Sequence, residues 1–183
     1  MAWCLPRLVA WPYYMPYMNT GTIWRTSTAS SSATEALGQR LGQLIKPPLL
    51  IELRSDLGGG KTTFMRGLAK GLGVKTAVTS PSFTLSQEYP AKSGMKLYHF
   101  DFYRLSESGV LADQLAEALS DPSGVVAVEW SDVAKDVLPP ERLTVEFKTA
   151  ADNPDVRELI LSSSQKYESL ARKLKTEQEK LRL

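Results

Sequence analysis

A glycine-rich turn joins two apolar segments of this 183-residue chain. Residues 49–53 form a short apolar run that is typical of a buried strand, and residues 62–72 form an amphipathic helix that ends at Gly73. A buried strand that passes through such a turn into a helix is the setting in which phosphate-binding loops occur. The sequence therefore predicts a layered α/β domain with a phosphate site at the start of this helix.

The residues of the turn suit phosphate binding. Glycines allow consecutive backbone amides to point inward around phosphate oxygens, and the first turn of the helix adds unpaired amides and the positive end of its dipole. Lys61 is placed to reach the β- and γ-phosphates of a nucleotide, and the hydroxyl of Thr62 is placed to bind magnesium. We predict that seven residues bind the nucleotide: Leu57, Gly58, Gly59, Gly60, Lys61, Thr62 and Thr63.

The turn departs at one position from the pattern G-x-x-x-x-G-K-[ST], because Ser55 stands where the first glycine is expected. A serine there would strain the turn if the backbone has a positive φ, and nucleotide binding would then weaken. The alternative interpretation is an ordinary tight turn without a ligand. We favour phosphate binding because the strand and the helix flank the turn in the required order.

Two carboxylates end apolar runs that are typical of further buried strands. Asp101 ends the run of residues 97–101, and Glu129 ends the run of residues 125–129. The carboxyl ends of neighbouring parallel strands meet at one edge of a sheet, where a nucleotide hydrolase needs acids beside magnesium. Both are candidate catalytic residues, as metal ligands or as groups that orient the attacking water; each could instead be a solvent-exposed acid. His99, within the first run, is expected to have a packing role.

The remaining patterns complete the predicted fold, a P-loop NTPase-like three-layer sandwich in which helices flank a mixed, mostly parallel sheet. A capping box at Ser32 and Glu35 predicts the start of a helix. Apolar residues at helical spacing predict another helix over residues 110–119. Residues 143–147 and 156–161 are predicted to be the two strands of a hairpin.

Three regions are expected along the chain. Residues 32–161 form the P-loop domain, residues 162–183 form a C-terminal helical tail, and residues 1–31 form a disordered or non-native extension. The extension is rich in Trp, Tyr and Pro, has no acidic residue, and lacks the uninterrupted apolar core of a secretory signal. We expect translation to begin at Met18 and residues 1–17 to be dispensable.

Composition excludes several classes of function. Lys and Arg number 22 against 20 Asp and Glu, so the net charge of +2 gives no electrostatic argument for wrapping DNA or another nucleic acid. The single cysteine, Cys4, excludes an intrachain disulfide and a cysteine-based zinc cluster, and the single histidine excludes a histidine-rich metal site. No apolar run is long enough to span a membrane. A cytoplasmic protein without a membrane partner is expected.

Four motifs together resemble the bacterial TsaE family, the small P-loop ATPases of tRNA threonylcarbamoyladenosine biosynthesis. The motifs are residues 56–63 (DLGGGKTT), 80–85 (SPSFTL), 99–105 (HFDFYRL) and 128–130 (VEW), and the resemblance covers about residues 32–160. It implies a domain that binds ATP with Mg²⁺ and hydrolyses it. Four motifs in the same order are far more specific than a phosphate-binding loop alone.

The resemblance also implies roles for individual residues and partners. By motif, Thr62 and Glu129 hold Mg²⁺, Asp101 is the Walker B-like acid, and residues 80–85 form a switch-like loop that senses the nucleotide. Family members act with the TsaD and TsaB proteins, which transfer a threonylcarbamoyl group to an adenosine beside the tRNA anticodon. Contact with tRNA is therefore expected only through that complex.

This chain departs from the family pattern in its loop, and two other functions stay open. Glycine is usual in the family where this chain has Ser55, and alanine is usual where it has Gly59. A small-molecule P-loop kinase shares the loop but usually carries a lid with several arginines, whereas Arg104, Arg142 and Arg157 are scattered. A nucleotide-binding interaction module would keep the loop but have little turnover.

Overall fold

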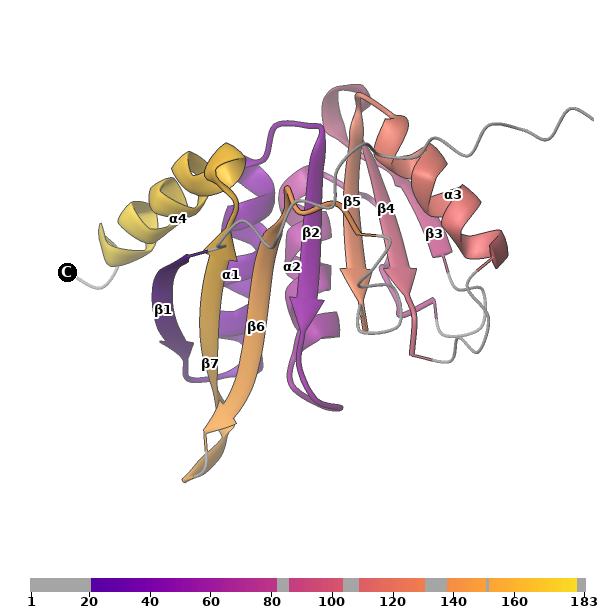
Figure 1. The fold of residues 1–183 in the computed structure, drawn as a ribbon. Coiled ribbons are helices and arrows are strands. Elements are labelled where there is room, and N and C mark those ends of the chain that lie inside the picture. The colour runs from indigo at the N-terminus through magenta and orange to yellow at the C-terminus, as the bar shows by residue number, and fades with distance from the viewer. Residues whose placement is uncertain (1–20, 82–85, 104–108, 131–137, 151, 181–183) are drawn as a thin grey trace, which may run out of the picture.

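The computed structural model of the chain describes residues 21–81, 86–103, 109–130, 138–150 and 152–180. Within these residues, a seven-stranded sheet is flanked by helices (Figure 1). The strands are β1 (Thr22–Thr28), β2 (Leu49–Arg54), β3 (Ser86–Pro90), β4 (Lys96–Asp101), β5 (Gly124–Glu129), β6 (Leu143–Ala150) and β7 (Asn153–Ser163). The helices are α1 (Ser31–Leu44), α2 (Lys61–Leu72), α3 (Gly109–Ser120) and α4 (Glu168–Lys180), with short 3-10 helices at Lys92–Gly94 and Gln165–Tyr167.

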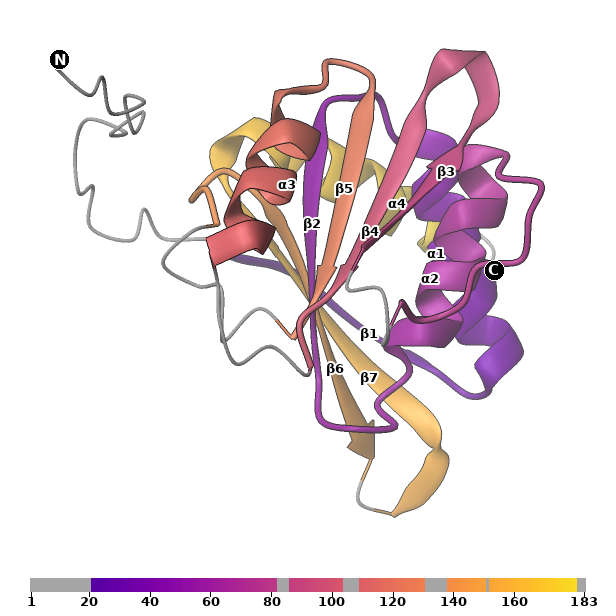
Figure 2. The ribbon, with the colours of Figure 1, turned by 90° about the vertical axis from the view of Figure 1, so that its right-hand side faces the viewer.

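The sheet is mixed, with the strand order β1-β7-β6-β2-β5-β4-β3. The central strands β6, β2, β5 and β4 are parallel, whereas β7 and β3 run opposite to them. Since β1 is antiparallel to β7, five of the seven strands share one direction. Helices α1 and α2 cover one face of the sheet and α3 covers the other (Figure 2), so the predicted three-layer, mostly parallel α/β fold is confirmed.

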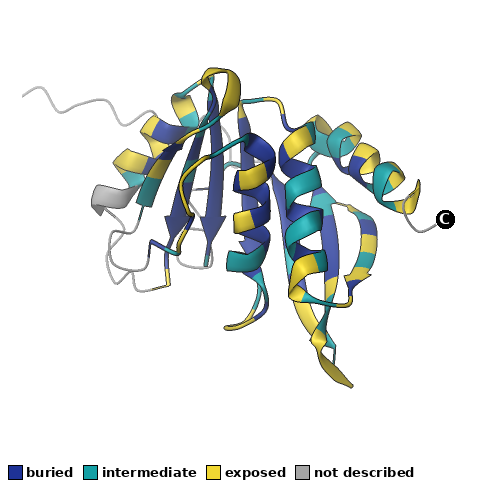
Figure 3. Ribbon diagram, turned by 180° about the vertical axis from the view of Figure 1, so that it is seen from behind, coloured by how far each residue is buried: buried dark blue, intermediate teal, exposed yellow. Residues whose placement is uncertain are grey.

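Apolar side chains form a core on each face of the sheet. The larger cluster includes Ile51 and Phe64 and lies under α1, α2 and α4, whereas the smaller one includes Phe100 and Val126 and lies under α3. Figure 3 shows that buried and exposed residues alternate along α1 and α2. The predicted apolar face of α2 is fully buried: Phe64, Met65, Leu68 and Leu72.

Helices α1 and α2 approach each other through glycines. A Cβ atom added to Gly67 would lie 1.9 Å from the carbonyl oxygen of Glu35, and one added to Gly42 would lie 2.3 Å from that of Leu68. Because only a hydrogen fits at these points, the two helix backbones can pack in direct contact. The contact fixes the position of α2, whose N-terminus follows the glycine-rich turn.

The structure places residues 22–31 inside the domain, contrary to the expected boundary at residue 32. Strand β1 pairs with β7, and Trp24 is buried in the larger core. The predicted capping box at Ser32 is also wrong, because the N-cap of α1 is Ser30, two residues earlier, and the helix begins at Ser31. The hydroxyl of Ser30 accepts a hydrogen bond from the amide of Ala33 at 3.1 Å. Met18 and the other residues of the 1–20 segment lie outside the described residues.

The C-terminal part of the chain continues the domain. The predicted hairpin is present as β6 and β7, which pair from Leu143–Ser163 to Ala150–Asn153. The predicted helical tail is α4, and its buried Ala171 and Leu174 belong to the larger core. No helix in the described part of the chain is long and apolar enough to cross a membrane.

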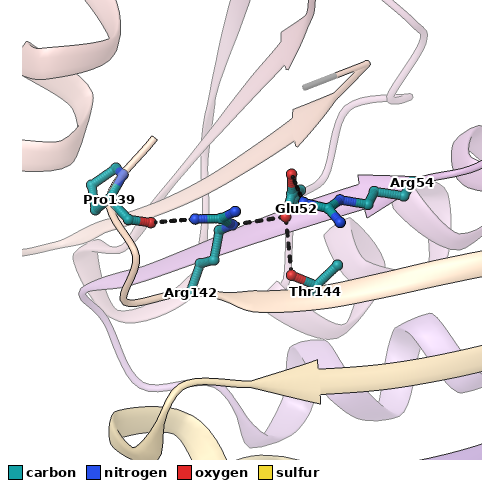
Figure 4. A network of polar contacts seen from close by, with 5 residues as sticks. All are labelled: Glu52, Arg54, Pro139, Arg142 and Thr144. Atoms are coloured by element: carbon teal, nitrogen blue, oxygen red, sulfur yellow. Dashed lines mark hydrogen bonds and ion pairs between the residues drawn. The ribbon is translucent and has the colours of Figure 1, made fainter. Parts of the chain in front are cut away.

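A buried acid in the middle of the sheet is neutralised by arginines (Figure 4). Glu52 on β2 accepts hydrogen bonds from the Nε atom of Arg142 at 2.7 Å, the hydroxyl of Thr144 at 3.0 Å and the Nη2 atom of Arg54 at 2.9 Å. Arg142 also donates from Nη1 to the carbonyl oxygen of Pro139 at 2.7 Å. Since a buried charge is tolerated only when it is paired, this network gives Arg142 a structural role that its sequence position did not predict.

Candidate nucleotide-binding site

The glycine-rich turn connects the carboxyl end of β2 to the first residue of α2, as predicted. Gly58 has φ 79° and Gly60, the N-cap of α2, has φ 108°. Residues other than glycine rarely adopt these left-handed backbone conformations, which is why the turn needs glycine at both positions. The helix N-terminus that follows leaves its first amides without intrahelical partners, so the turn can offer them to an anion.

The side chain of Lys61 folds back over this turn. Its Nζ atom donates to the Oγ atom of Ser55 at 2.8 Å, the carbonyl oxygen of Ser55 at 3.1 Å and the carbonyl oxygen of Asp56 at 3.3 Å. An ammonium group has three donors, so the turn itself satisfies all of them. The same Nζ atom lies 3.9 Å from the ring centroid of Trp130, at cation–π distance.

The predicted acids lie near Lys61 and therefore near the glycine-rich turn. Burial lowers the pKa of Lys61 below its ordinary value of 10.5, while the negative charges of Glu129, Asp101 and Asp56 partly raise it again. The pairing of the strands places these groups together, since Leu53 near the end of β2 is paired with Glu129 of β5, and Glu129 is paired with Asp101 of β4. The structure therefore brings the turn after β2 together with the ends of β4 and β5.

Asp101 and Glu129 are neighbours at the carboxyl end of the sheet. Asp101 is the last residue of β4, Glu129 is the last residue of β5, and the two are paired in register. Both are buried, with 4% and 2% of their surfaces exposed. The alternative in which each is an exposed acid at a strand end is therefore wrong.

The two acids have different hydrogen-bond partners. Asp101 accepts from the backbone amide of Tyr103 at 3.1 Å and from the hydroxyl of Ser80. Ser80 is the first residue of the predicted switch-like loop; residues 82–85 of that loop lie outside the described residues. Glu129 accepts from the Nε2 atom of buried His99 at 2.9 Å. His99 thus fixes the orientation of Glu129 as well as packing in the core.

The donor set fits a magnesium ion that is shared with a nucleotide. Thr62 is the second residue of α2, and Glu129 lies at the end of β5, the strand beside β2. In the part of the chain that the structure describes, no three or more His, Cys, Asp or Glu residues gather as a metal site. Magnesium is commonly held by one or two carboxylates together with substrate phosphates, and that mode needs no larger cluster.

Four residues contact the turn, its lysine or one of the two acids in ways that were not predicted. They are Ser55, His99, Trp130 and Arg157. Arg157 reaches the turn from β7, where its Nη2 atom donates to the carbonyl oxygen of Gly58 at 3.4 Å. Its aliphatic part lies beside Gly60, because a Cβ atom added there would be 3.8 Å from its Cγ atom. Arg157 is close to the turn only through the pairing of distant strands, and its sequence position carries no signal of that contact.

The expected strain at Ser55 is absent. Among the described residues, only Ser93 and Trp130 have a positive φ without being glycine. Ser55 therefore adopts a backbone conformation that is open to any residue. The reason that sequence reasoning gave for weakened nucleotide binding does not apply.

The fold and the site are those of the P-loop NTPase-like class of α/β folds. Its features here are a parallel strand, a glycine-rich turn at a helix N-terminus, a lysine over that turn and two acids at neighbouring strand ends. Within this class, the chain belongs to the TsaE family. Residues 28–159 match the family model described as "Threonylcarbamoyl adenosine biosynthesis protein TsaE".

Individual relatives agree with the family match. The chain is 36% identical over 152 residues to the tRNA threonylcarbamoyladenosine biosynthesis protein TsaE of Bacillus subtilis, covering 82% of this chain and 92% of the relative. It is 34% identical to the protein of the same name in Treponema pallidum, covering 70% and 93%. The crystal structure of Bacillus subtilis YdiB superimposes with a TM-score of 0.70 at 34% identity, covering 85% of this chain and 95% of that structure.

Proposed function

We propose that this chain binds MgATP, hydrolyses it, and thereby serves the threonylcarbamoyladenosine modification of tRNA. The observation that carries the proposal is the convergence of Lys61, Asp101 and Glu129 beside a glycine-rich turn at a helix N-terminus. A phosphate loop that faces two buried acids is the arrangement that nucleotide hydrolysis requires. The assignment to the tRNA pathway rests on the relatives, which are named as biosynthesis proteins of that nucleoside.

In the proposed mechanism, the turn binds the phosphates first. Backbone amides of residues 57–60 and the first amides of α2 donate to phosphate oxygens, with further contacts from Thr62 and Thr63. Lys61 exchanges one or more of its bonds within the turn for the β- and γ-phosphates. The exchange costs little because an ammonium that leaves a hydroxyl or a carbonyl gains a charged acceptor.

The acids act at the γ-phosphate side of the site. Thr62 and Glu129 would hold Mg²⁺, which when bound supplies charge neutralisation for the transferred phosphoryl group. Asp101 would orient the attacking water and receive its proton, with Ser80 and the amide of Tyr103 holding the carboxylate in place. Because Ser80 belongs to the predicted switch-like loop, the state of the nucleotide can reach that loop through Asp101.

The proposed partners follow from the family. We infer that the chain works in the cytoplasm with TsaD and TsaB type proteins, and that it meets tRNA only within their complex. The net charge of +2 agrees with this indirect role, because a protein that binds tRNA by itself usually carries a strong basic excess.

The direct test of nucleotide binding is Lys61→Ala. Loss of the ammonium should weaken ATP binding roughly a hundredfold while the fold stays intact, because charge-assisted bonds to two phosphates disappear. Isothermal calorimetry measures the affinity, and circular dichroism checks the fold. Lys70→Ala is the matched control, since Lys70 lies on the same helix, is exposed and contacts Glu35 rather than the turn. ATP affinity equal to that of the wild type in Lys61→Ala would overturn the assignment.

Turnover is tested by phosphate release, measured for the chain alone and with TsaD and TsaB. We expect hydrolysis that depends on magnesium and increases in the presence of the partners. Binding of ATP without release under either condition would favour the interaction module. Transfer of phosphate to a small-molecule acceptor would favour the kinase.

A further inference from the structure

We propose that Ser55 is a positioning residue for Lys61 in the nucleotide-free loop, and that its presence requires glycine at position 59. The inference rests on the proposed function, because it concerns how the loop exchanges Lys61 with the phosphates of ATP. Two separate observations carry it, one steric and one polar.

The steric observation is that the side chain of Ser55 occupies the space that a side chain at position 59 would need. A Cβ atom added to Gly59 would lie 2.5 Å from both the Cβ and the Oγ atoms of Ser55, closer than side-chain atoms approach in proteins. The next nearest atom is the carbonyl oxygen of Asp56 at 3.2 Å, a tight contact that a shift of a few tenths of an ångström would relieve.

The backbone at Gly59 does not itself demand glycine. Unlike Gly58 and Gly60, Gly59 lacks a positive φ, so an alanine could adopt its conformation. Gly59 is also buried, which leaves a side chain there no route to solvent. The main obstacle to a side chain at position 59 is therefore Ser55. The loop can carry a Cβ atom at position 55 or at position 59, but not at both without rearranging.

The polar observation is that the hydroxyl of Ser55 is the nearest acceptor of Lys61. Its Oγ atom accepts from Nζ at 2.8 Å while it donates to the carbonyl oxygen of Asp56 at 2.8 Å. A glycine at position 55 would retain the carbonyl contact and lose the hydroxyl. The hydroxyl thus adds a third bond that ties the ammonium to the turn itself.

This contact should oppose ATP binding. The ammonium must give up the hydroxyl when it moves to the β- and γ-phosphates, so any stability that the contact gives to the nucleotide-free loop is subtracted from the affinity. Removing the hydroxyl should tighten ATP binding about threefold to tenfold, the amount expected for one ordinary hydrogen bond after its exchange with water.

The experiment uses the full chain and four variants: Ser55→Ala, Ser55→Gly, Gly59→Ala and the double variant Ser55→Gly/Gly59→Ala. The thermal midpoint of the nucleotide-free protein and the ATP affinity by calorimetry are measured for each. Ser55→Ala is the matched variant for the polar contact, since it keeps the Cβ atom and removes only the hydroxyl.

Two results are expected. Ser55→Ala should tighten ATP binding without raising the thermal midpoint. If Ser55 had a merely structural role, the same substitution would lower the midpoint and weaken ATP binding. Gly59→Ala should lower the midpoint by roughly 2–10 °C and weaken ATP binding, and the addition of Ser55→Gly should restore most of both losses. Unchanged or weaker affinity in Ser55→Ala would overturn the positioning role. An equal loss from Gly59→Ala in the two backgrounds would overturn the steric coupling.

The outcome for the proposed function is separate. If the wild-type chain binds no ATP, the proposed function fails. The coupling between positions 55 and 59 is still decided by the thermal midpoints of the nucleotide-free proteins. A further cycle with Lys61→Ala decides the polar contact in the same way: Ser55→Ala should lower the midpoint more when Lys61 is present than when it is absent, because only the bond from Ser55 to the carbonyl oxygen of Asp56 is lost in the second case. An equal change in the two backgrounds would overturn the polar contact.

Discussion

At the scale of single residues, Asp101 and Glu129 occupy neighbouring positions with different surroundings. Asp101 contacts the backbone after its own strand and a hydroxyl from the segment after α2, so its orientation depends on loops. Glu129 contacts His99 within the sheet, so its orientation depends on the most rigid part of the molecule. A fixed carboxylate suits a metal ligand, whereas one that is coupled to a loop suits a group that responds to the state of the nucleotide.

Substitution of each acid should separate these roles. Glu129→Gln should lose magnesium-dependent ATP affinity by roughly tenfold and hydrolysis with it, because a neutral amide is a poor magnesium ligand. Asp101→Asn should bind MgATP nearly normally and hydrolyse it roughly a hundredfold more slowly, because the group that takes the proton of water is lost. Nucleotide titrations with and without magnesium, followed by phosphate release, measure both effects.

The control for this pair is Asp121→Asn. Asp121 precedes β5 at the opposite end of that strand, where it accepts a hydrogen bond from the hydroxyl of Tyr98. Its variant should bind and hydrolyse ATP like the wild type. Equal and small effects of Glu129→Gln and Asp101→Asn would show that neither acid faces the nucleotide, and the interaction module would then be the better explanation.

The residues of the site divide into those with a local sequence pattern and those without one. Lys61, Asp101 and Glu129 were predictable because a turn or a strand end directly precedes each of them and the ends of parallel strands meet. The contact between Ser55 and Lys61 is local as well. Whether a serine at position 55 strains the turn or fits it depends, however, on a backbone conformation that the sequence does not reveal. The contact of Arg157 with Gly58 joins positions that are far apart in the chain, and it follows only from the pairing of β7 in the finished sheet.

At the scale of secondary structure, β1 shows how composition can mislead. Residues 22–28 follow a segment rich in aromatic residues and proline, and that shift in composition suggested an extension outside the domain. The strand itself has buried residues at Trp24 and Thr28, and among the strands that the structure describes it pairs with β7 alone. An edge strand of this kind has a weak pattern in the sequence because just one of its faces is covered and its stability comes from its neighbour. The continuous, mostly apolar runs of β2 and β5 are buried on both faces and were predicted from that pattern.

Trp24 should therefore contribute strongly to the stability of the domain. Trp24→Ala removes a large side chain that is 7% exposed and packs in the core with α1 and α4, and it should lower the free energy of unfolding by about 3 kcal/mol. Urea denaturation followed by circular dichroism measures the change. Trp24→Phe is the control and should lose much less, because most of the apolar contact remains.

The position of β1 also predicts how far the chain can be shortened. A chain that begins at Met18 retains all of β1 and should unfold at the same urea concentration as the full chain. A chain that begins at Ser30 lacks β1 and should be destabilised by at least as much as Trp24→Ala. Equal stability of the two shortened chains would show that β1 contributes nothing to the fold.

At the scale of the whole molecule, the candidate site is assembled from elements that lie far apart in the sequence. The turn after β2, the start of α2, the ends of β4 and β5, and Arg157 of β7 all meet at one end of the sheet. The packed glycines of α1 and α2 hold these two helices in direct contact, which fixes the position of α2 in its layer. A ligand that bridges these elements binds only the folded chain, so its binding energy should add to the stability of the entire domain.

MgATP should therefore raise the thermal midpoint of the full chain. At a concentration about a hundred times the dissociation constant, a ligand that binds only the folded state adds about 2.7 kcal/mol to its stability, which corresponds to roughly 5–10 °C for a domain of this size. Differential scanning calorimetry at several concentrations of MgATP measures the shift, which should grow with the logarithm of the concentration. Lys61→Ala should abolish the shift, whereas Lys70→Ala should keep it, since only Lys61 faces the glycine-rich turn. A midpoint that does not move at saturating MgATP would mean that the converged turn, lysine and acids do not form a nucleotide site, because a ligand that contacts so many separate elements cannot bind without stabilising their arrangement.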